Sequence, residues 1–372
     1  MQTQSLIKHI STIPDPRIEG KCSHKLVDII AISICAIICG AEDWNSIEEF
    51  GQTKQSWFES FLELPHGIPS HDTFRRLFFM LSPEAFERFF TEWVRDIAGL
   101  VQGVIAIDGK TLRRSHDRRL GKKAIHMVSA WSVENQLVLG QVKTEEKSNE
   151  ITAIPKLLNM LAIKGCIITL DAMGCQRSIA QQIIDQEGDY LMALKGNQEK
   201  LSKAVEALFD QADTNGFEGC DFSYHETKEV SRDRTEIRRH WTLSCDETLE
   251  EAKKWASLNT LGRVESERTV KGKTTIEHRY YISSIENNAE LFGRSVRQHW
   301  GVENSLHWQL DVSFREDESR IRKGYSAQNF AVMRHMALNL LKQEKSLKLG
   351  VKNKRLRAGW DEEYLKIVLN GT

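Results

Sequence analysis

The sequence predicts an α/β protein: a mixed sheet flanked by helices, with a helical region before it and a β-rich insertion within it. Three observations predict this fold. Apolar residues recur at helical spacing through residues 1–98, whereas from about residue 102 short β-rich runs alternate with helical stretches. Residues 200 to about 285 are polar and charged with alternating hydrophobicity, which indicates an inserted β-rich segment.

Length and composition limit the class of protein. A chain of 372 residues with 40% hydrophobic content is long enough for two or three folded units. The longest apolar run, Leu26 to Cys39, is shorter than a bilayer span, and the amino terminus lacks a secretory pattern, so we expect a cytoplasmic protein with no membrane segment. The seven scattered cysteines argue against a disulfide framework and a structural zinc site. With a net charge of -1, any DNA binding must come from local basic patches.

The first unit, residues 1–98, is expected to be helical. Its last helix has a start signal at Ser82-Pro83-Glu84, where an N-cap serine precedes a proline at the first helical position and an acid in the first turn. The aromatic residues that follow recur at helical spacing, which is typical of a core-facing stripe.

The second unit, residues 99–345, contains the predicted sheet. Three β-rich runs joined by hairpin-length loops come first, and helix and strand then alternate, which favours a mixed sheet with helices packed on it. In chain order the predicted elements are strands at 104–108, 126–133 and 137–143, a helix at 153–161, a strand at 166–171, a helix at 175–186 and a strand at 190–195. After the insertion, helical spacing returns from about Ala289 to about Asp311, and residues 346–372 form a basic, helical tail.

Two of the predicted strands end in an aspartate. Asp108 follows the apolar run 104–107, and Asp171 follows the apolar run 166–170. An acid at the end of an apolar strand is placed to face a cleft, and neighbouring strands can bring both carboxylates to one place. Each aspartate also has a structural interpretation, because Asp108 could begin a turn with Gly109 and Asp171 could cap the next helix.

Glu303 is the third candidate. Positions 292, 296, 299, 303, 306 and 310 form one stripe of the predicted helix, occupied by Phe, Val, His, Glu, Leu and Leu. Glu303 is therefore expected on the face that packs against the sheet, where a buried carboxylate needs a cation, a metal ion or a raised pKa. A salt bridge to Arg297 or another nearby base is the structural alternative.

Three acids from two strands and a helix match the requirements of a two-metal phosphoryl-transfer site. Carboxylate oxygens are suitable ligands for Mg²⁺ or Mn²⁺. A pair of such ions activates an attacking hydroxyl and stabilises the leaving oxygen of an in-line displacement. The residues therefore predict two divalent ions held by Asp108, Asp171 and Glu303.

Several longer stretches resemble one known family. They are DPR at 15–17, GIPSHDT at 67–73, IAIDGKTLR at 105–113, EKSNEITAIP at 146–155, DAMGCQ at 171–176, KGNQ at 195–198 and HWGVENSLHW at 299–308. On these stretches the sequence closely resembles the H-repeat-associated proteins, a branch of the bacterial insertion-sequence transposases of the DDE type. The match runs from near the start of the chain to beyond residue 320.

The resemblance implies an RNase-H-like catalytic domain at 99–345, divalent-metal dependence, and Asp108, Asp171 and Glu303 as the catalytic triad, with an insertion between the second and third acids. The implied activity is cleavage and transfer of DNA strands at insertion-sequence ends. The implied partners are double-stranded DNA, both the element's terminal inverted repeats and target DNA, and further copies of the chain in a synaptic homo-oligomer. The implied location is the bacterial nucleoid.

The chain departs from the wider DDE group at one signature. That group carries a tyrosine, an arginine and a lysine at fixed spacings from the glutamate, and those positions here hold Val296, His299 and Leu310. The candidate substitutes in DNA contact are Arg297, His299, Asn304 and His307.

Further DNA contacts are expected from basic and polar residues near the two aspartates. The stretch 109–123, which leaves the strand of Asp108, offers Lys110, Arg113 and Arg114 to a phosphate backbone. Lys195 and Asn197, in a loop after a strand, could contact the scissile strand or make a turn.

Two other functions remain open. Many members of this branch are relics, so the chain could be an inactive or repurposed protein that binds DNA without catalysis. Alternatively, His299, Glu303, His307 and Asp311 lie one helical turn apart, which is the kind of spacing found in metallohydrolase zinc sites.

Overall fold

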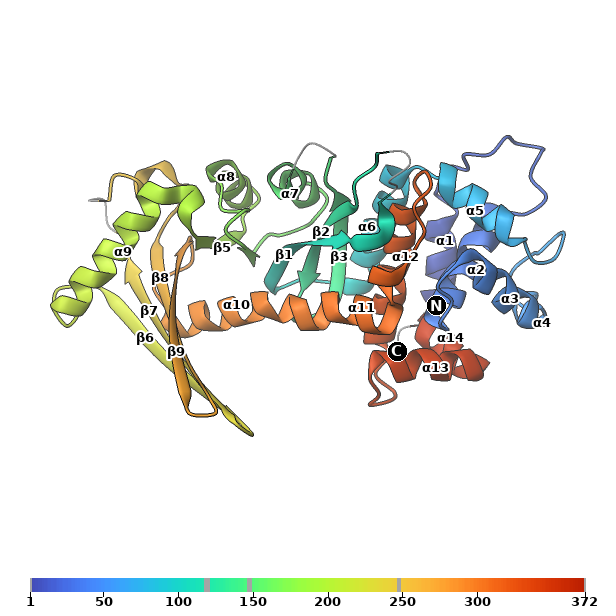
Figure 1. Cartoon of the computed structure of the whole chain (residues 1–372). Coiled ribbons are helices and arrows are strands. Elements are labelled where there is room, and N and C mark those ends of the chain that lie inside the picture. The colour runs from blue at the N-terminus through green and yellow to red at the C-terminus, as the bar shows by residue number, and fades with distance from the viewer. Residues whose placement is uncertain (1, 117–120, 146–148, 246–248, 371–372) are drawn as a thin grey trace.

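The first unit of the chain is helical, as the sequence predicts. The computed structural model describes residues 2–116, 121–145, 149–245 and 249–370 (Figure 1). The helices of this unit are α1 (Gln2–Ile10), α2 (Leu26–Ile38), α3 (Trp44–Thr53), α4 (Gln55–Phe58), α5 (His71–Met80) and α6 (Pro83–Ala98). At the start of α6 the Ser82 hydroxyl accepts a hydrogen bond from the Ala85 N–H, so the predicted start of this helix is confirmed.

One nine-stranded mixed sheet forms the centre of the molecule, in the order β3-β2-β1-β4-β5-β9-β8-β7-β6. Its first five strands are β1 (Gly103–Leu112), β2 (Ile125–Ser132), β3 (Leu137–Lys143), β4 (Cys166–Leu170) and β5 (Asp189–Leu194). The β1, β2 and β3 strands are antiparallel, whereas β4 pairs in parallel with both β1 and β5. With the connecting helices α7 (Glu150–Leu158) and α8 (Arg177–Asp185), this is the RNase-H-like mixed sheet that the resemblance implies.

The insertion extends this same sheet. Its strands are β6 (Phe222–Ser231), β7 (Arg234–Ser244), β8 (Thr260–Val270) and β9 (Lys273–Ser283). The β9 strand pairs antiparallel with β5, which covers an edge that would otherwise expose unpaired backbone groups. One detail of the prediction was wrong: residues 199–214 form a helix, α9 (Glu199–Thr214), because its apolar residues fall on one buried face at helical spacing.

A long helical segment runs along one face of the sheet, opposite α7 and α8, and leads from the insertion back to the first unit (Figure 1). It consists of α10 (Ala289–Val302), a π-helical turn (Glu303–His307) and α11 (Trp308–Phe314). The α10 helix contacts β1, β4 and β5, so it lies against the strands that lead to Asp108 and Asp171. The sequence predicts this helix but not the π turn, in which backbone hydrogen bonds span five residues rather than four.

The C-terminal helices pack against the first unit. They are α12 (Ser326–Gln343), α13 (Val351–Trp360) and α14 (Glu362–Asn370). The predicted basic tail is therefore in part a structural element: Lys354 is buried and pairs with Glu344 at 2.9 Å, and the buried Arg355 donates a hydrogen bond to the carbonyl of Ile37. Among the described residues no helix has the length and apolar character needed to cross a membrane.

A buried asparagine closes the outer edge of the sheet. Asn339 of α12 accepts a hydrogen bond from the Val138 N–H at 2.8 Å and donates one to the Val138 carbonyl at 2.9 Å. Val138 lies in β3, the edge strand, so these backbone groups have no neighbouring strand to bond. The Asn339 side chain thus makes the two backbone hydrogen bonds that a neighbouring strand would make at this position.

Asn339→Leu should lower the free energy of unfolding by about 2–4 kcal/mol, because it leaves a buried N–H and a buried carbonyl of Val138 without partners. Urea denaturation followed by circular dichroism measures the change. Asn353→Leu, on the exposed side of α13, is the matched control and should change stability by no more than about 0.5 kcal/mol. Equal effects of the two substitutions would contradict the role of Asn339.

Candidate active site

Asp108 and Asp171 are brought together by two neighbouring parallel strands. The pairing of β1 with β4 ends at Ile107 and Leu170, and each aspartate is the next residue along its chain. Both line one cavity of about 320 Å³. Asp108 remains within β1, paired with Ser129 of β2, so the interpretation of Asp108 as the start of a turn was wrong.

A backbone N–H group holds one oxygen of each aspartate. Asp108 Oδ1 accepts a hydrogen bond from the Gly109 N–H at 2.9 Å. Asp171 Oδ1 accepts from the N–H groups of Met173 and Gly174 at 2.9 and 3.1 Å, so Asp171 also stabilises the turn before α8. Among the described residues neither Oδ2 atom accepts a hydrogen bond, and the nearest polar group to Asp108 Oδ2 that forms an ion pair is His307 Nδ1 at 3.6 Å.

Glu303 lines the same cavity from the helical side. Its predicted burial was wrong, because 61% of its side chain is exposed. Its neighbours on the predicted stripe, Val296, Leu306 and Leu310, are buried as expected, whereas Glu303 itself faces the open cavity. The predicted alternative was a salt bridge to Arg297 or another nearby base. Arg297 is not that partner, since it pairs with Glu229 of β6 at 3.3 Å, and the basic group beside Glu303 is His307, with Nδ1 at 3.7 Å.

His307 lies between Asp108 and Glu303. Its Nδ1 is 3.6 Å from Asp108 Oδ2 and 3.7 Å from Glu303 Oε2. One ligand atom from each of these three residues lies within 4.8 Å of the other two, a spacing that suits a single metal ion. The donors are oxygen and imidazole nitrogen, which fits the divalent metal that the DDE domain implies. Among the described residues Asp171 does not join this trio, although it lines the same cavity.

The electrostatics of the cavity disfavour a negative Asp108. Burial of its carboxyl raises the pKa of Asp108 to about 7, against the opposing effect of the Gly109 N–H, and the charges of Glu150, Glu303 and Asp171 raise it further. Burial also lowers the pKa of His307 and of His299. A divalent cation in the cavity would reverse the first of these effects, because it stabilises the carboxylate form.

A glutamate that the residue patterns did not single out also lies next to Asp108. Glu150, at the start of α7, is 2.7 Å from His126 Nε2, and His126 Nδ1 is 2.8 Å from the Thr111 hydroxyl. A Cβ atom at Gly109 would lie 2.1 Å from Glu150 Oε1. The absence of a side chain at Gly109 therefore allows the Glu150 carboxylate to lie directly against β1. Glu150 belongs to the EKSNEITAIP stretch of the resemblance, which is the signal that could have found it.

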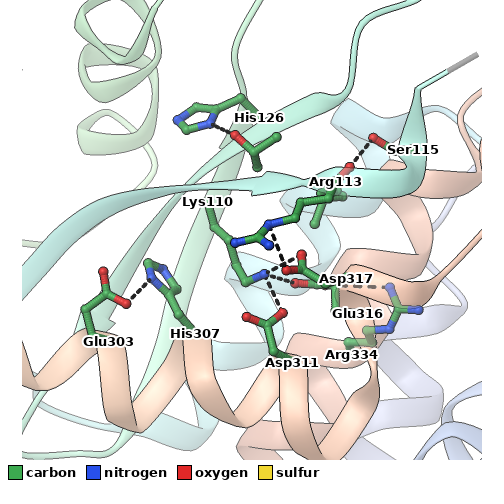
Figure 2. Close-up of polar contacts among 12 residues, drawn as sticks. Lys110, Arg113, Ser115, His126, Glu303, His307, Asp311, Glu316, Asp317 and Arg334 are labelled. Atoms are coloured by element: carbon green, nitrogen blue, oxygen red, sulfur yellow. Dashed lines mark hydrogen bonds and ion pairs between the residues drawn. The ribbon is translucent and has the colours of Figure 1, made fainter. Parts of the chain in front are cut away.

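Lys110 points away from solvent into a group of carboxylates (Figure 2). Its Nζ is 2.6 Å from Asp311, 3.3 Å from Asp317 and 3.6 Å from Glu316, and only 12% of its side chain is exposed. Arg334, also buried, lies 3.6 Å from Glu316. We call these five residues the Lys110 cluster. Burial works to lower the pKa of Lys110, but the three carboxylates outweigh it and raise the pKa above its ordinary value.

The other predicted DNA contacts lie at several places around the cavity. Arg113 is exposed and contacts Asp317 at 3.0 Å, and Arg114 is exposed beside it. Lys195 is exposed and lines the cavity. Asn197 donates a hydrogen bond to the carbonyl of Ala172, so it stabilises the turn after Asp171. The basic residues 118 and 119 lie outside the described part of the chain.

The helix contributes the remaining candidates. Arg297 and Asn304 line a groove of about 730 Å³ between α10 and the insertion strands, and Glu303 lines it as well. His299 Nδ1 is 3.0 Å from the Thr169 hydroxyl. Because Asp311 pairs with Lys110, the set His299, Glu303, His307 and Asp311 does not form the zinc site of the metallohydrolase alternative in the described structure.

Residues 99–340 match the Transposase DDE domain family, and residues 7–94 match the DDE_Tnp_1-associated family. The chain belongs to the DDE transposase family. This membership confirms the resemblance drawn from the sequence motifs.

Individual relatives in the DDE family differ in length. The chain is 45% identical over 378 residues to "H repeat-associated putative transposase YhhI" of Escherichia coli strain K12, which covers 100% of this chain and 99% of that relative. It is 44% identical over 77 residues to "Inactive transposase YbfQ" of the same strain, which covers 21% of this chain and 92% of that relative.

One solved structure, the piggyBac transposase synaptic complex with hairpin DNA, aligns with a TM-score of 0.43 at 10% identity over 98% of this chain and 81% of that chain. This similarity is too weak to support a conclusion about the fold or the site.

Lys110→Met should lower the free energy of unfolding by about 3–5 kcal/mol, because the buried Glu316 and the neighbouring carboxylates lose the positive charge that pairs with them. Lys203→Met, which removes an exposed pair with Glu199, is the control and should cost at most about 0.5 kcal/mol. Urea denaturation compares them. Unchanged stability together with weakened DNA binding would instead assign Lys110 to phosphate contact.

Asp108→Asn should stabilise the metal-free protein in a pH-dependent way. The pKa of Asp108 in the folded protein, about 7, lies above its ordinary 3.8, so the folded state binds more protons between these pH values and stability falls as pH rises through them. Asparagine does not titrate, so the variant does not lose stability in this way as the pH rises. In EDTA the variant should exceed the parent by about 2–4 kcal/mol at pH 8 and by less than about 0.5 kcal/mol at pH 4. Urea denaturation at both pH values tests this, and a constant difference would contradict it.

Proposed function

We propose that this chain is a DDE-type transposase that cleaves DNA at the ends of its element and transfers the freed strands to target DNA. The observation that carries the proposal is the convergence of Asp108, Asp171 and Glu303 on one cavity, in a chain whose family is that of the DDE transposases. The catalytic unit in this proposal is residues 99–345, with residues 1–98 as an associated helical domain and 346–372 as a basic tail.

Asp108, Asp171 and Glu303 are the proposed metal ligands and catalytic residues. Two bound Mg²⁺ or Mn²⁺ ions would supply activation of the attacking hydroxyl and stabilisation of the leaving oxygen. The backbone N–H groups of Gly109, Met173 and Gly174 orient the two aspartates by holding one oxygen of each. The chain supplies no covalent nucleophile in this scheme, so its work is to position ions and DNA.

Proposed DNA contacts surround the cavity. The partner is double-stranded DNA, both terminal inverted repeats and target DNA, which a homo-oligomer at the cytoplasmic nucleoid brings together. Arg297 and Asn304 line the groove next to Glu303, and Lys195 lines the cavity itself. Arg113 and Arg114 are exposed on the turn after β1. Lys110, engaged by three carboxylates, and the buried His307 are left out of this set.

Asp108→Asn and Glu303→Gln should each reduce strand cleavage in Mg²⁺ by about a hundredfold or more, because each removes a proposed metal ligand. The assay is cleavage of linear DNA that carries the element's terminal repeats, with DNA binding followed by mobility shift. Glu199→Gln, an exposed substitution on α9, is the control and should cleave like the parent.

Two results would contradict the assignment. Cleavage unaffected by both substitutions would remove the triad from the reaction. A parent protein that binds the terminal repeats but does not cleave them would support the alternative of a DNA-binding protein without catalysis.

A further inference from the structure

His307 has no part in the proposed triad, yet it lies among its members. The residue is 7% exposed, and its Nδ1 faces oxygens of both Asp108 and Glu303. Figure 2 shows the imidazole beside Glu303 on the side of the helix that faces β1. Its Nε2 is buried and has no hydrogen-bond partner in the described part of the chain. A buried imidazole without a conventional partner calls for an explanation.

The distances do not describe a hydrogen bond. Nitrogen–oxygen hydrogen bonds are about 2.7–3.2 Å long, and the separations from His307 Nδ1 are 3.6 and 3.7 Å. They do fit two ligands of one ion. Ligand atoms that each lie about 2.1 Å from an ion are about 3 Å apart when adjacent and about 4.2 Å apart when opposite. The two separations from His307 Nδ1 fall in this range, and the three donor atoms all lie within 4.8 Å of one another.

The surrounding structure holds His307 in this place without DNA. Asp311, one turn further along the helix, pairs with Lys110 of β1 at 2.6 Å. Lys110 is two residues from Asp108 in β1. The ion pair therefore holds the helical segment of Glu303 and His307 against the strand of Asp108. Glu303 and His307 are the first and last residues of the π turn and their side chains lie 3.7 Å apart, and such turns are frequent at functional sites.

We infer that His307 is a ligand of the ion held by Asp108 and Glu303, so that this half of the site is a carboxylate–imidazole centre that selects Mn²⁺ over Mg²⁺. The inference rests on the proposed function for the existence of the ion. Mg²⁺ prefers oxygen ligands and keeps several waters, whereas an imidazole nitrogen favours transition-metal ions. The triad alone, with oxygen donors only, gives no such preference.

The test uses the full-length protein without DNA and Mn²⁺ as the probe. Pulsed electron paramagnetic resonance detects an imidazole nitrogen coupled to bound Mn²⁺, and we expect this coupling in the parent and its loss in His307→Ala and His307→Asn. Titration should show Mn²⁺ affinity falling about tenfold or more in both variants, with a smaller decrease for Mg²⁺ measured by competition.

His71→Gln is the matched control. His71 also pairs through Nδ1 with a glutamate, Glu48, at 2.6 Å, but it lies in the helical first unit. This variant should keep both the nitrogen coupling and the Mn²⁺ affinity of the parent.

Three outcomes would overturn the inference: bound Mn²⁺ without nitrogen coupling in the parent, coupling that persists in both His307 variants, or no bound Mn²⁺ at millimolar concentration. Absence of nitrogen coupling in the parent overturns the inference even if the variants fold poorly, whereas loss of coupling in the variants distinguishes His307 from His299, which lines the same cavity. Strand cleavage separates this inference from the proposed function. Nitrogen coupling without cleavage removes only the transposase activity, and cleavage without nitrogen coupling removes only the role of His307.

Discussion

Repulsion among the carboxylates around Asp108 is the constraint on which the rest of the site depends. Burial removes the water that would screen these charges, and Glu150, Glu303 and Asp171 all act to keep Asp108 protonated. Such an arrangement persists only if the surrounding fold holds the oxygens in place against their repulsion. A divalent ion would turn this repulsion into attraction, so binding of such an ion would stabilise the folded protein.

The Lys110 cluster supplies much of that restraint. Lys110 and Arg334 lie among Asp311, Glu316 and Asp317, so the end of the helical segment is tied to β1 by ion pairs that are mostly buried. These pairs cost desolvation, and replacing them all with apolar residues of the same volume would cost little stability. Their value lies in position: they fix the segment that carries Glu303 beside the strand that carries Asp108. A purely apolar contact would leave the register of the helix less defined.

The sequence predicts the order of the sheet elements well, because apolar strands that end in an acid are local signals, and the three acids that it singles out line one cavity. Three features depend on tertiary structure and could not be predicted. Glu303 is exposed because it lines the cavity, although Leu306 and Leu310 on the same predicted stripe are buried. Lys110 was assigned to DNA because a sequence does not show which carboxylates lie opposite a lysine. Glu150 enters the site only because α7 begins beside Gly109.

The insertion explains how Asp171 and Glu303 can be far apart in the chain and close in space. The chain leaves the central sheet after β5, adds four strands to that same edge, and returns along the opposite face in α10. Strands added at an edge do not disturb the pairing of β1 with β4, so the two aspartates keep their relation whatever the length of the insertion. The added strands also form one wall of the groove that Glu303 shares. A segment of this kind can therefore change the surface next to the third acid while the positions of the two aspartates stay fixed.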